Sequence, residues 1–285
     1  MSRVLRSAAA LYVGHLLTFT RSRTAVYWTL AFPLFFLMLY GFVFARDNAG
    51  NLKSLMPGLL SITVISGSLF GVALRMVTER ETGVLRRLRL TPVHPLAVVL
   101  AHGAMALSTL LGSLLIQSLV AHFVFHFQVA GSLLAYVLVL VLGGLAIIPI
   151  GLVVGSVARD SKVAPAMTNF LFFPLLFISG AAIPYTYLPE WLQRLGRLVP
   201  TTYLVESLQG VIVRGAGLLE LKIPIVMLLL TGVIGVSVNG LLFRWESTEP
   251  VRVKRLLVAV VALGLIYGTA FVFEPSLHIA QRAGK

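Results

Sequence analysis

The segment Glu79-Arg-Glu-Thr-Gly-Val-Leu-Arg-Arg-Leu-Arg-Leu-Thr-Pro92 is a short charged island between two long apolar runs. No charged residue occurs in 54–74 before it, or in 90–158 beyond its last arginine. A charged segment of this kind has to lie outside the hydrocarbon core of a membrane. At about 1.5 Å per residue it makes roughly four turns of helix, which is too little for a domain. We therefore expect a short surface helix through which an aqueous partner acts on the membrane part.

The composition places the chain in a membrane. It has 285 residues, of which 58% are hydrophobic and 12% charged. A soluble domain carries about 25% charged residues, and uncharged runs of about 18 or more residues indicate membrane-spanning helices. These features predict an all-α polytopic membrane protein. The net charge of +13 then reflects basic residues that flank the spans and face membrane lipids, so no nucleic acid partner is expected. There is no cysteine, which excludes disulfides and thiolate metal sites.

The order of polar and apolar segments predicts one transmembrane domain, residues 1–245. Apolar residues recur at helical spacing between the arginines of residues 1–23, which predicts an amphipathic helix on the membrane surface. Six spans are expected after it, at about 24–45, 54–74, 96–121, 132–158, 163–183 and 223–243. Residues 246–285 form a C-terminal extension, in which the uncharged residues 256–273 predict a seventh span.

Residues 184–214 differ from the rest of the membrane part. They contain two short amphipathic pieces bounded by proline and glycine, and neither piece is long enough to span. Irregular backbone at membrane depth is tolerated only where protein or water covers it. We therefore expect a re-entrant helix pair that dips into one leaflet.

The distribution of lysine and arginine predicts the orientation. If the N-terminus is cytoplasmic and the segments alternate, 15 of the 23 basic residues lie inside and 8 outside. Cytoplasmic loops carry the excess of basic residues in multi-pass proteins. The charged island is then expected in the cytoplasm, and the re-entrant pair and the C-terminus outside.

Two motifs together resemble the type-2 exporter permeases of ATP-binding-cassette (ABC) transporters. The first is Glu79-Arg80-Glu81-x-Gly83-x-Leu85-x-x-Leu88-x-x-Thr91-Pro92. The second is Ser179-Gly180-x-x-x-Pro184, followed by Leu188-Pro189-x-Trp191-Leu192-Gln193 and Pro200-x-Thr202-Tyr203. The resemblance covers residues 1–245 and implies a six-span permease core, so the predicted seventh span is a departure from the family pattern.

The resemblance also implies roles for individual segments. Residues 79–90 would be a coupling helix that docks in a groove of a separate ATPase subunit, and residues 1–23 a connecting helix beside it. Spans one, two and five would line the substrate path and the dimer seam, and residues 184–214 would cap the path externally. The implied ATPase-coupling residues are Glu79, Arg80, Glu81, Gly83, Leu85, Arg86, Arg87 and Leu88. The implied external gate consists of Pro184, Pro189, Trp191, Pro200, Tyr203 and Glu206. Because Asn169 is a polar residue among aromatic ones in the fifth span, Asn169, Phe170 and Phe173 are the candidates for the substrate path.

The leading functional hypothesis is the transmembrane subunit of an ATP-driven exporter in the inner (plasma) membrane. The chain contains no Gly-x-x-x-x-Gly-Lys-Ser/Thr phosphate loop, so we expect no enzymatic activity of its own. ATP and magnesium would be bound by the partner ABC ATPase, present in two copies, and a second permease copy would complete a homodimer. A hydrophobic or amphipathic substrate (a drug, an antibiotic, a lipid or lipid-linked cargo) would move outward by alternating access.

Two other classes of function remain as alternatives. An ion-coupled secondary transporter usually needs an ionisable residue within the membrane, but the ten acidic residues all fall in loops, in 184–214 or at span ends. A membrane-embedded enzyme could use His122 and His126, which are spaced to share a helix face and ligate a metal. No acidic residue accompanies these two histidines, so we expect neither a metal site nor a catalytic residue nor a cofactor in the chain.

Overall fold

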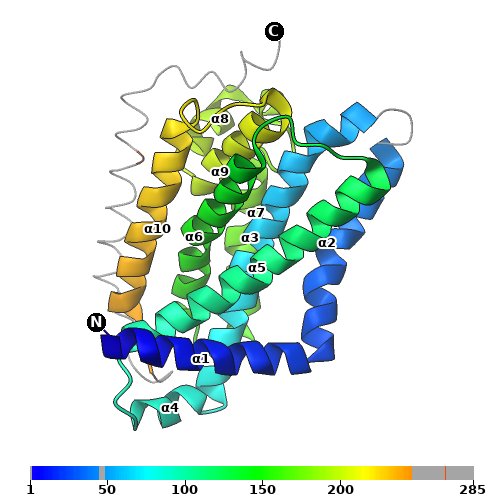
Figure 1. Ribbon diagram of the computed structural model, residues 1–285. Coiled ribbons are helices and arrows are strands. Elements are labelled where there is room, and N and C mark those ends of the chain that lie inside the picture. The colour runs from blue at the N-terminus through cyan, green and yellow to red at the C-terminus, as the bar shows by residue number, and fades with distance from the viewer. Residues whose placement is uncertain (1, 45–48, 246–266, 268–285) are drawn as a thin grey trace.

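The computed structural model describes residues 2–44, 49–245 and 267 of the chain. All regular secondary structure in these residues is helical (Figure 1), which confirms the predicted all-α fold. In chain order the elements are α1 (Ser2–Arg21), α2 (Arg23–Phe44), α3 (Ala49–Glu81), α4 (Val84–Arg89), α5 (Pro95–Phe125), α6 (Leu133–Val157), α7 (Val163–Ile178), η1 (Tyr185–Tyr187), α8 (Glu190–Gly196), α9 (Pro200–Gln209), η2 (Gly210–Arg214) and α10 (Lys222–Leu242).

Five of the described helices are long and apolar enough to cross a membrane, which confirms a multi-pass membrane protein. They are α2, α3, α5, α6 and α10. The helix of the expected fifth span, α7, is apolar but has only 16 residues. In the other direction, α3 continues beyond the expected end of the second span as far as Glu81. The first residues of the charged island therefore extend a membrane helix, and only residues 84–89 form a separate helix, α4.

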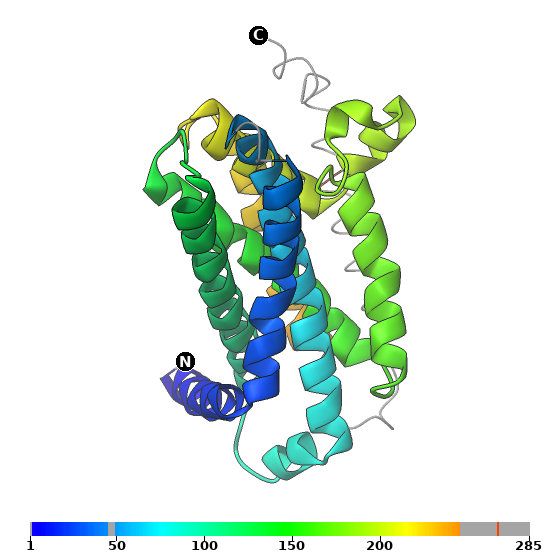
Figure 2. The same cartoon turned by 90° about the vertical axis from the view of Figure 1, so that its right-hand side faces the viewer.

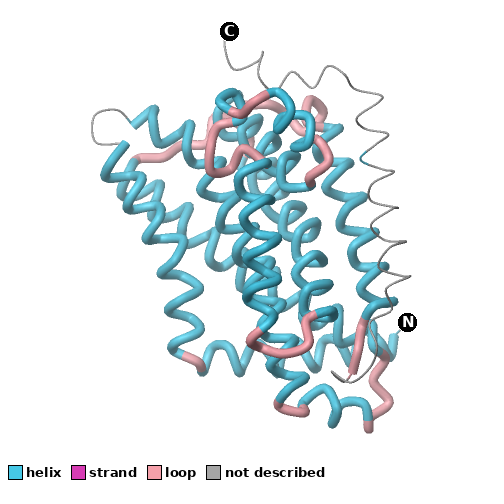
Figure 3. The backbone as a smooth tube through the Cα atoms, turned by 180° about the vertical axis from the view of Figure 1, so that it is seen from behind, coloured by secondary structure: helices cyan, strands magenta, loops and turns pink. Residues whose placement is uncertain are grey.

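The short helices lie at the two ends of the bundle. Figure 1 shows α1 crossing one end of the long helices with α4 beside it, whereas α8 and the start of α9 lie at the opposite end. Figure 2 shows α2 and α7 on either side of α3. In the view from behind, the loops also gather at the two ends (Figure 3). The bundle thus has one end that carries α1 and α4, and another that carries residues 184–214, whose expected re-entrant position in the membrane stays a prediction.

Glycines let α6 pack closely against its neighbours. A Cβ atom at Gly151 would overlap the carbonyl oxygen of Ser68 in α3, and one at Gly143 would overlap the side chain of Leu204 in α9. Small residues permit such close approach of helix backbones in membranes. The core therefore centres on α6, which packs against α3, α9 and α10.

Two buried arginines hold the C-terminal end of α6. The last carbonyl groups of a helix have no partner within the helix, and cations are favourable at that end. Arg80 donates hydrogen bonds to the carbonyl oxygens of Gly155 and Ala158, and Arg244 to those of Ser156 and Val157. The end of α3 is thereby fixed to the end of α6.

The predicted seventh span, 256–273, lies outside the described residues except for Tyr267. This tyrosine is buried, and its hydroxyl group hydrogen-bonds with that of Thr231 in α10. Its ring centre lies 5.7 Å from that of Tyr203 in α9. At this position the C-terminal extension therefore packs against α9 and α10.

Candidate functional site

The charged island bends sharply at Gly83. This residue is the N-cap of α4 and has a φ of 73°, in the left-handed region that glycine adopts without a steric penalty. A Cβ atom at Gly83 would meet nothing within 4 Å. The structure thus gives this glycine a conformational role, because it redirects the chain from α3 into α4.

Beyond the bend, α4 presents basic residues to its surroundings and is anchored by leucine. Leu85 is fully buried and Leu88 is half-buried against the core. Arg86 and Arg87 are exposed. α4 therefore has an outward basic face and an inward apolar face.

Glu79, Arg80 and Glu81, which precede the bend, contact other parts of the permease itself. Glu79 is half-buried between α1 and α5, and Arg80 is buried against α6. Glu81 is exposed and accepts a hydrogen bond of 2.9 Å from the backbone N–H of Ser161. Their expected contact with an ATPase stays a prediction. The observed role of Arg80 is to attach the start of the island to the end of α6.

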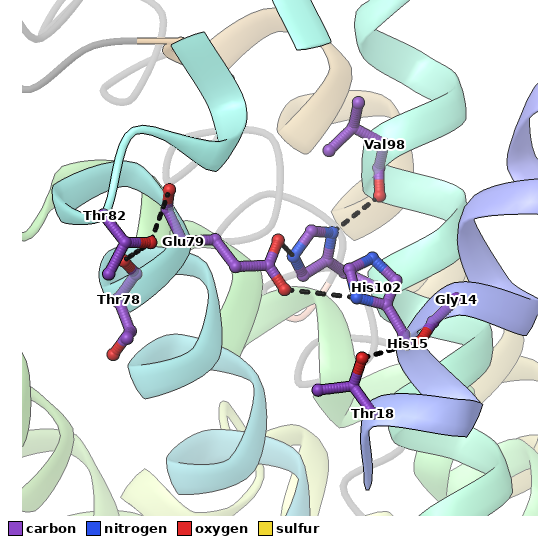
Figure 4. Close-up of polar contacts among 8 residues, drawn as sticks. All are labelled: Gly14, His15, Thr18, Thr78, Glu79, Thr82, Val98 and His102. Atoms are coloured by element: carbon purple, nitrogen blue, oxygen red, sulfur yellow. Dashed lines mark hydrogen bonds and ion pairs between the residues drawn. The ribbon is translucent and has the colours of Figure 1, made fainter. Parts of the chain in front are cut away.

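Glu79 joins three helices (Figure 4). One carboxylate oxygen, Oε1, lies 3.1 Å from Nδ1 of His15 in α1, and the other, Oε2, lies 3.0 Å from Nε2 of His102 in α5. The two imidazole ring centres are 4.6 Å apart. The side chain of His102 is 1% exposed. Neither histidine was predicted as a partner of Glu79, because the sequence shows only a single histidine within each of the two apolar stretches.

Both ring nitrogens of His102 face acceptors. Nδ1 lies 2.9 Å from the carbonyl oxygen of Val98, and Nε2 faces the carboxylate of Glu79. A neutral imidazole has one N–H group and one lone pair. If Nδ1 donates to Val98, a cation is required between Nε2 and the carboxylate, and it can be a proton or a metal ion.

The other histidine pair, which the sequence analysis considered for a metal, is arranged differently. His122 and His126 are exposed. Nδ1 of His122 contacts the carbonyl oxygen of Phe127, and His126 ends α5 in the left-handed conformation. Within the described residues, the one group of three potential metal ligands consists of His15, Glu79 and His102.

A large apolar cavity lies beside these residues. Its volume is about 1040 Å³, and its walls come mainly from α2, α3, α5 and α7. The lining includes nine phenylalanine, tyrosine and tryptophan side chains: Phe19, Trp28, Phe32, Phe36, Tyr40, Phe70, Phe172, Phe173 and Phe177. The helices of spans one, two, three and five thus meet at one cavity, and the role of this cavity as the substrate path stays a prediction.

The candidate path residues divide into two groups. Asn169 and Phe173 line the cavity, whereas Phe170 does not line it and is 79% exposed on another face of α7. Arg75 was not among the residues predicted for the path. Among the described residues it is the one lysine or arginine that lines the cavity, and its guanidinium lies 5.9 Å from the ring centre of Phe19.

At the other end, prolines begin the short helices of the re-entrant segment. Pro184 and Pro189 are the N-caps of η1 and α8, and Pro200 lies in the first turn of α9. Proline is tolerated there because its missing N–H would have no helical partner. The sequence pattern is therefore consistent with the observed breaks.

Tyrosines stabilise this segment internally. Burial raises the pKa of Tyr185 to about 12, so its hydroxyl group stays protonated and donates to the carbonyl oxygen of Gln193. Tyr203 is buried and donates to the carbonyl oxygen of Arg197 over 2.8 Å. Trp191 is 64% exposed and Glu206 is half-buried. The gate role of these residues stays a prediction.

Comparisons with known proteins agree with the resemblance. A family model described as ABC-2 type transporter matches residues 7–213. Over 158 residues the chain is 30% identical to the inner membrane transport permease YhhJ of Escherichia coli (strain K12), which is 55% of this chain and 42% of YhhJ. Over 163 residues it is 23% identical to the "Probable multidrug ABC transporter permease YbhR" of the same strain, with 57% of this chain and 44% of YbhR covered. Over 176 residues it is 24% identical to ABC transporter G family member 20 of Dictyostelium discoideum, with 62% of this chain and 24% of that protein covered.

The matches thus span less than half the length of each of these relatives. The family model, in contrast, covers most of the chain and includes the island, the cavity walls and the re-entrant segment. The chain therefore belongs to the ABC-2 type transporter family, as its two motifs indicated.

Proposed function

We propose that the chain is the transmembrane subunit of an ATP-driven exporter and moves a hydrophobic or amphipathic substrate out of the cell. One observation carries the proposal: α3 contributes to the wall of the cavity and also leads directly into α4. Residues of α3 between Ile62 and Arg75 line the cavity, and only two residues separate the end of this helix at Glu81 from the start of α4 at Val84. A displacement of α4 by a partner is therefore transmitted along a continuous helix to the substrate site.

The partner in this proposal is a separate ABC ATPase. Two ATPase copies would draw together on binding ATP and magnesium, and each would move one α4 in a dimer of the permease. Such coupling works as a population shift, in which ATP binding favours the outward-facing state. The complex would sit in the inner membrane with α1 and α4 on the cytoplasmic side, in agreement with the excess of basic residues there.

The cavity suggests the chemistry of the cargo. Its lining is mainly aromatic and aliphatic, which suits the apolar part of a drug, an antibiotic or a lipid. Arg75 places a positive charge at the wall, where it interacts with the charge of Glu79. We therefore favour amphipathic compounds, whose polar group can lie beside Arg75 while the apolar part contacts the aromatic side chains.

Charge reversal on the outward face of α4 tests this function. Arg87→Glu should abolish substrate-stimulated ATPase activity and transport in liposomes that contain the permease and its ATPase, because the basic face would no longer match the docking groove. Arg194→Glu reverses a charge at the opposite end of the molecule, where Arg194 is exposed and lies 3.8 Å from Glu190, and it should leave both activities nearly unchanged.

Two results would contradict the proposal. One is normal coupled ATPase activity in Arg87→Glu. The other is transport by the wild type that continues without ATP and collapses when the proton gradient is dissipated, which would favour the ion-coupled alternative.

A further inference from the structure

We propose that His15, Glu79 and His102 form a zinc site that fastens α1 and α5 to the end of α3. The three side chains come from three helices and offer two imidazole nitrogens and one carboxylate oxygen. Their potential ligand atoms all lie within 4.8 Å of one another. Figure 4 shows both imidazole rings directed at the carboxylate of Glu79.

The distances are close to those of a zinc site. Zinc binds imidazole nitrogen and carboxylate oxygen at about 2.0–2.2 Å, so two ligands at a tetrahedral angle lie roughly 3.3 Å apart. The two contacts of Glu79 measure 3.1 Å from Oε1 to His15 and 3.0 Å from Oε2 to His102. The ligand nitrogens of the two histidines lie within 4.8 Å of each other, so binding of one ion would draw the two rings closer together.

The polar atoms between Glu79 and His102 need a cation. Oε2 of Glu79 and Nε2 of His102 are buried, and within the described residues each has only the other as a partner, at 3.0 Å. This contact requires either an added proton on His102 or a metal ion between the two atoms, and Nε2 of His15, the nitrogen not facing Glu79, is buried without a hydrogen-bond partner among those residues. Buried polar atoms normally have partners, so this cluster is a candidate for an ion.

The surroundings of His102 match those of a metal-binding histidine. Such a histidine usually donates its second ring N–H to a carboxylate or a backbone carbonyl group, which fixes the tautomer. Nδ1 of His102 lies 2.9 Å from the carbonyl oxygen of Val98. With the hydrogen on Nδ1, the lone pair of Nε2 points toward Glu79, and a metal ion between them removes the repulsion.

The ligand set selects the metal. Calcium and magnesium prefer oxygen ligands, whereas imidazole suits zinc and other late transition metals. Zinc sites with three protein ligands keep a fourth position for water or another group. His102 also lines the apolar cavity, so this fourth position lies near the substrate site. The metal would hold α1, α5 and the C-terminal end of α3 together, which is a role beyond the proposed transport function.

Zinc binding by the full chain tests this inference directly. The purified protein, stripped with EDTA and desalted, should bind about one Zn²⁺ per chain in mass-spectrometric metal analysis. Co²⁺ in place of zinc should give the intense visible absorption of a four-coordinate ion. His15→Ala and His102→Ala should each weaken Zn²⁺ binding by more than about tenfold.

The matched control is His122→Ala. It removes an exposed histidine of the pair that the sequence offered as an alternative site, and it should leave Zn²⁺ binding unchanged. Helix content by circular dichroism verifies that each variant is folded. His102→Gln, which keeps a polar side chain of similar length, serves if the alanine variant unfolds.

Three results would overturn the inference. The first is the absence of stoichiometric Zn²⁺ binding by the wild type. The second is undiminished binding in folded His15→Ala and His102→Gln. The third is loss of binding in His122→Ala, which would place the metal at the end of α5 instead.

Discussion

At the end of the bundle that carries α4, polar side chains reach across to distant helices, whereas at the end that carries α8 they bond mainly within their own segment, with Thr201, which donates to Leu175 in α7, as an exception. Arg80 donates to Gly155, 75 residues away in the chain, and Glu79 contacts both α1 and α5. At the opposite end, Tyr203 bonds to Arg197, six residues away, as the hydroxyl group of Thr202 does to Gly196.

The difference bears on how each end works. Long-range contacts tie α1, α3, α5 and α6 into one unit, so the island moves only together with the membrane helices. Most polar side-chain bonds of residues 184–214 are local, while α9 within this segment packs against α3, α6 and α10. This difference fits the proposed function, in which the ATPase would move the end that carries α4 and the opposite end would form the external gate. Three substitutions test the difference.

The largest effect is expected for Arg80→Met. The substitution removes hydrogen bonds from a charged donor to the buried carbonyl oxygens of Gly155 and Ala158, and bonds of this kind contribute about 1.5–3 kcal/mol each. We expect the free energy of unfolding to fall by about 3 kcal/mol, measured by denaturant titration in detergent micelles. Arg87→Met on the exposed face should change the free energy of unfolding by less than about 0.5 kcal/mol. Equal effects of Arg80→Met and Arg87→Met would contradict a stabilising role for the contact between Arg80 and α6.

A smaller effect is expected for Gly83→Ala. A Cβ atom costs about 1–2 kcal/mol in the left-handed conformation, although it meets no neighbouring atom here. The variant should be less stable by that amount and should couple ATP hydrolysis to substrate less well. Gly83→Asn should recover part of both losses, because asparagine tolerates this conformation better. If alanine and asparagine behave alike, the bend does not depend on the backbone conformation of Gly83.

The smallest effect is expected for Tyr203→Phe. It deletes the local hydrogen bond to Arg197 and leaves the ring in place against Tyr267, so stability should fall by about 1 kcal/mol. Because the contact is local, ATPase stimulation should remain. A loss of stimulation as large as that of Gly83→Ala would mean that residues 184–214 are coupled to the movement of the island.

Much of the fold was predictable because the membrane imposes a simple pattern. The helices over 24–45 and 132–158 appear within about two residues of their expected bounds, because uncharged runs of that length have to be helical in lipid. Two boundaries moved for local reasons. α7 ends at Ile178, shortly before the left-handed Gly180, and α3 runs on to Glu81 because its last turn packs against α6.

The candidate site was predictable only in part. The sequence pointed to Glu79 as a residue of the island but not to its partners, since His15 and His102 are far from it in the chain and belong to other helices. Likewise, Phe170 and Phe173 look equivalent in the sequence. Only the packing of α7 shows that, of these two, Phe173 lines the cavity and Phe170 does not.

The sequence alone therefore determined the helical membrane fold, the position of the charged island and the family, because hydrophobic length and local motifs carry that information. The tertiary structure decided which polar groups are buried together, where the cavity lies and why Gly83 bends the chain. These features depend on how separate helices pack, and a side chain such as Arg80 can face outward or inward with the same neighbours in the chain.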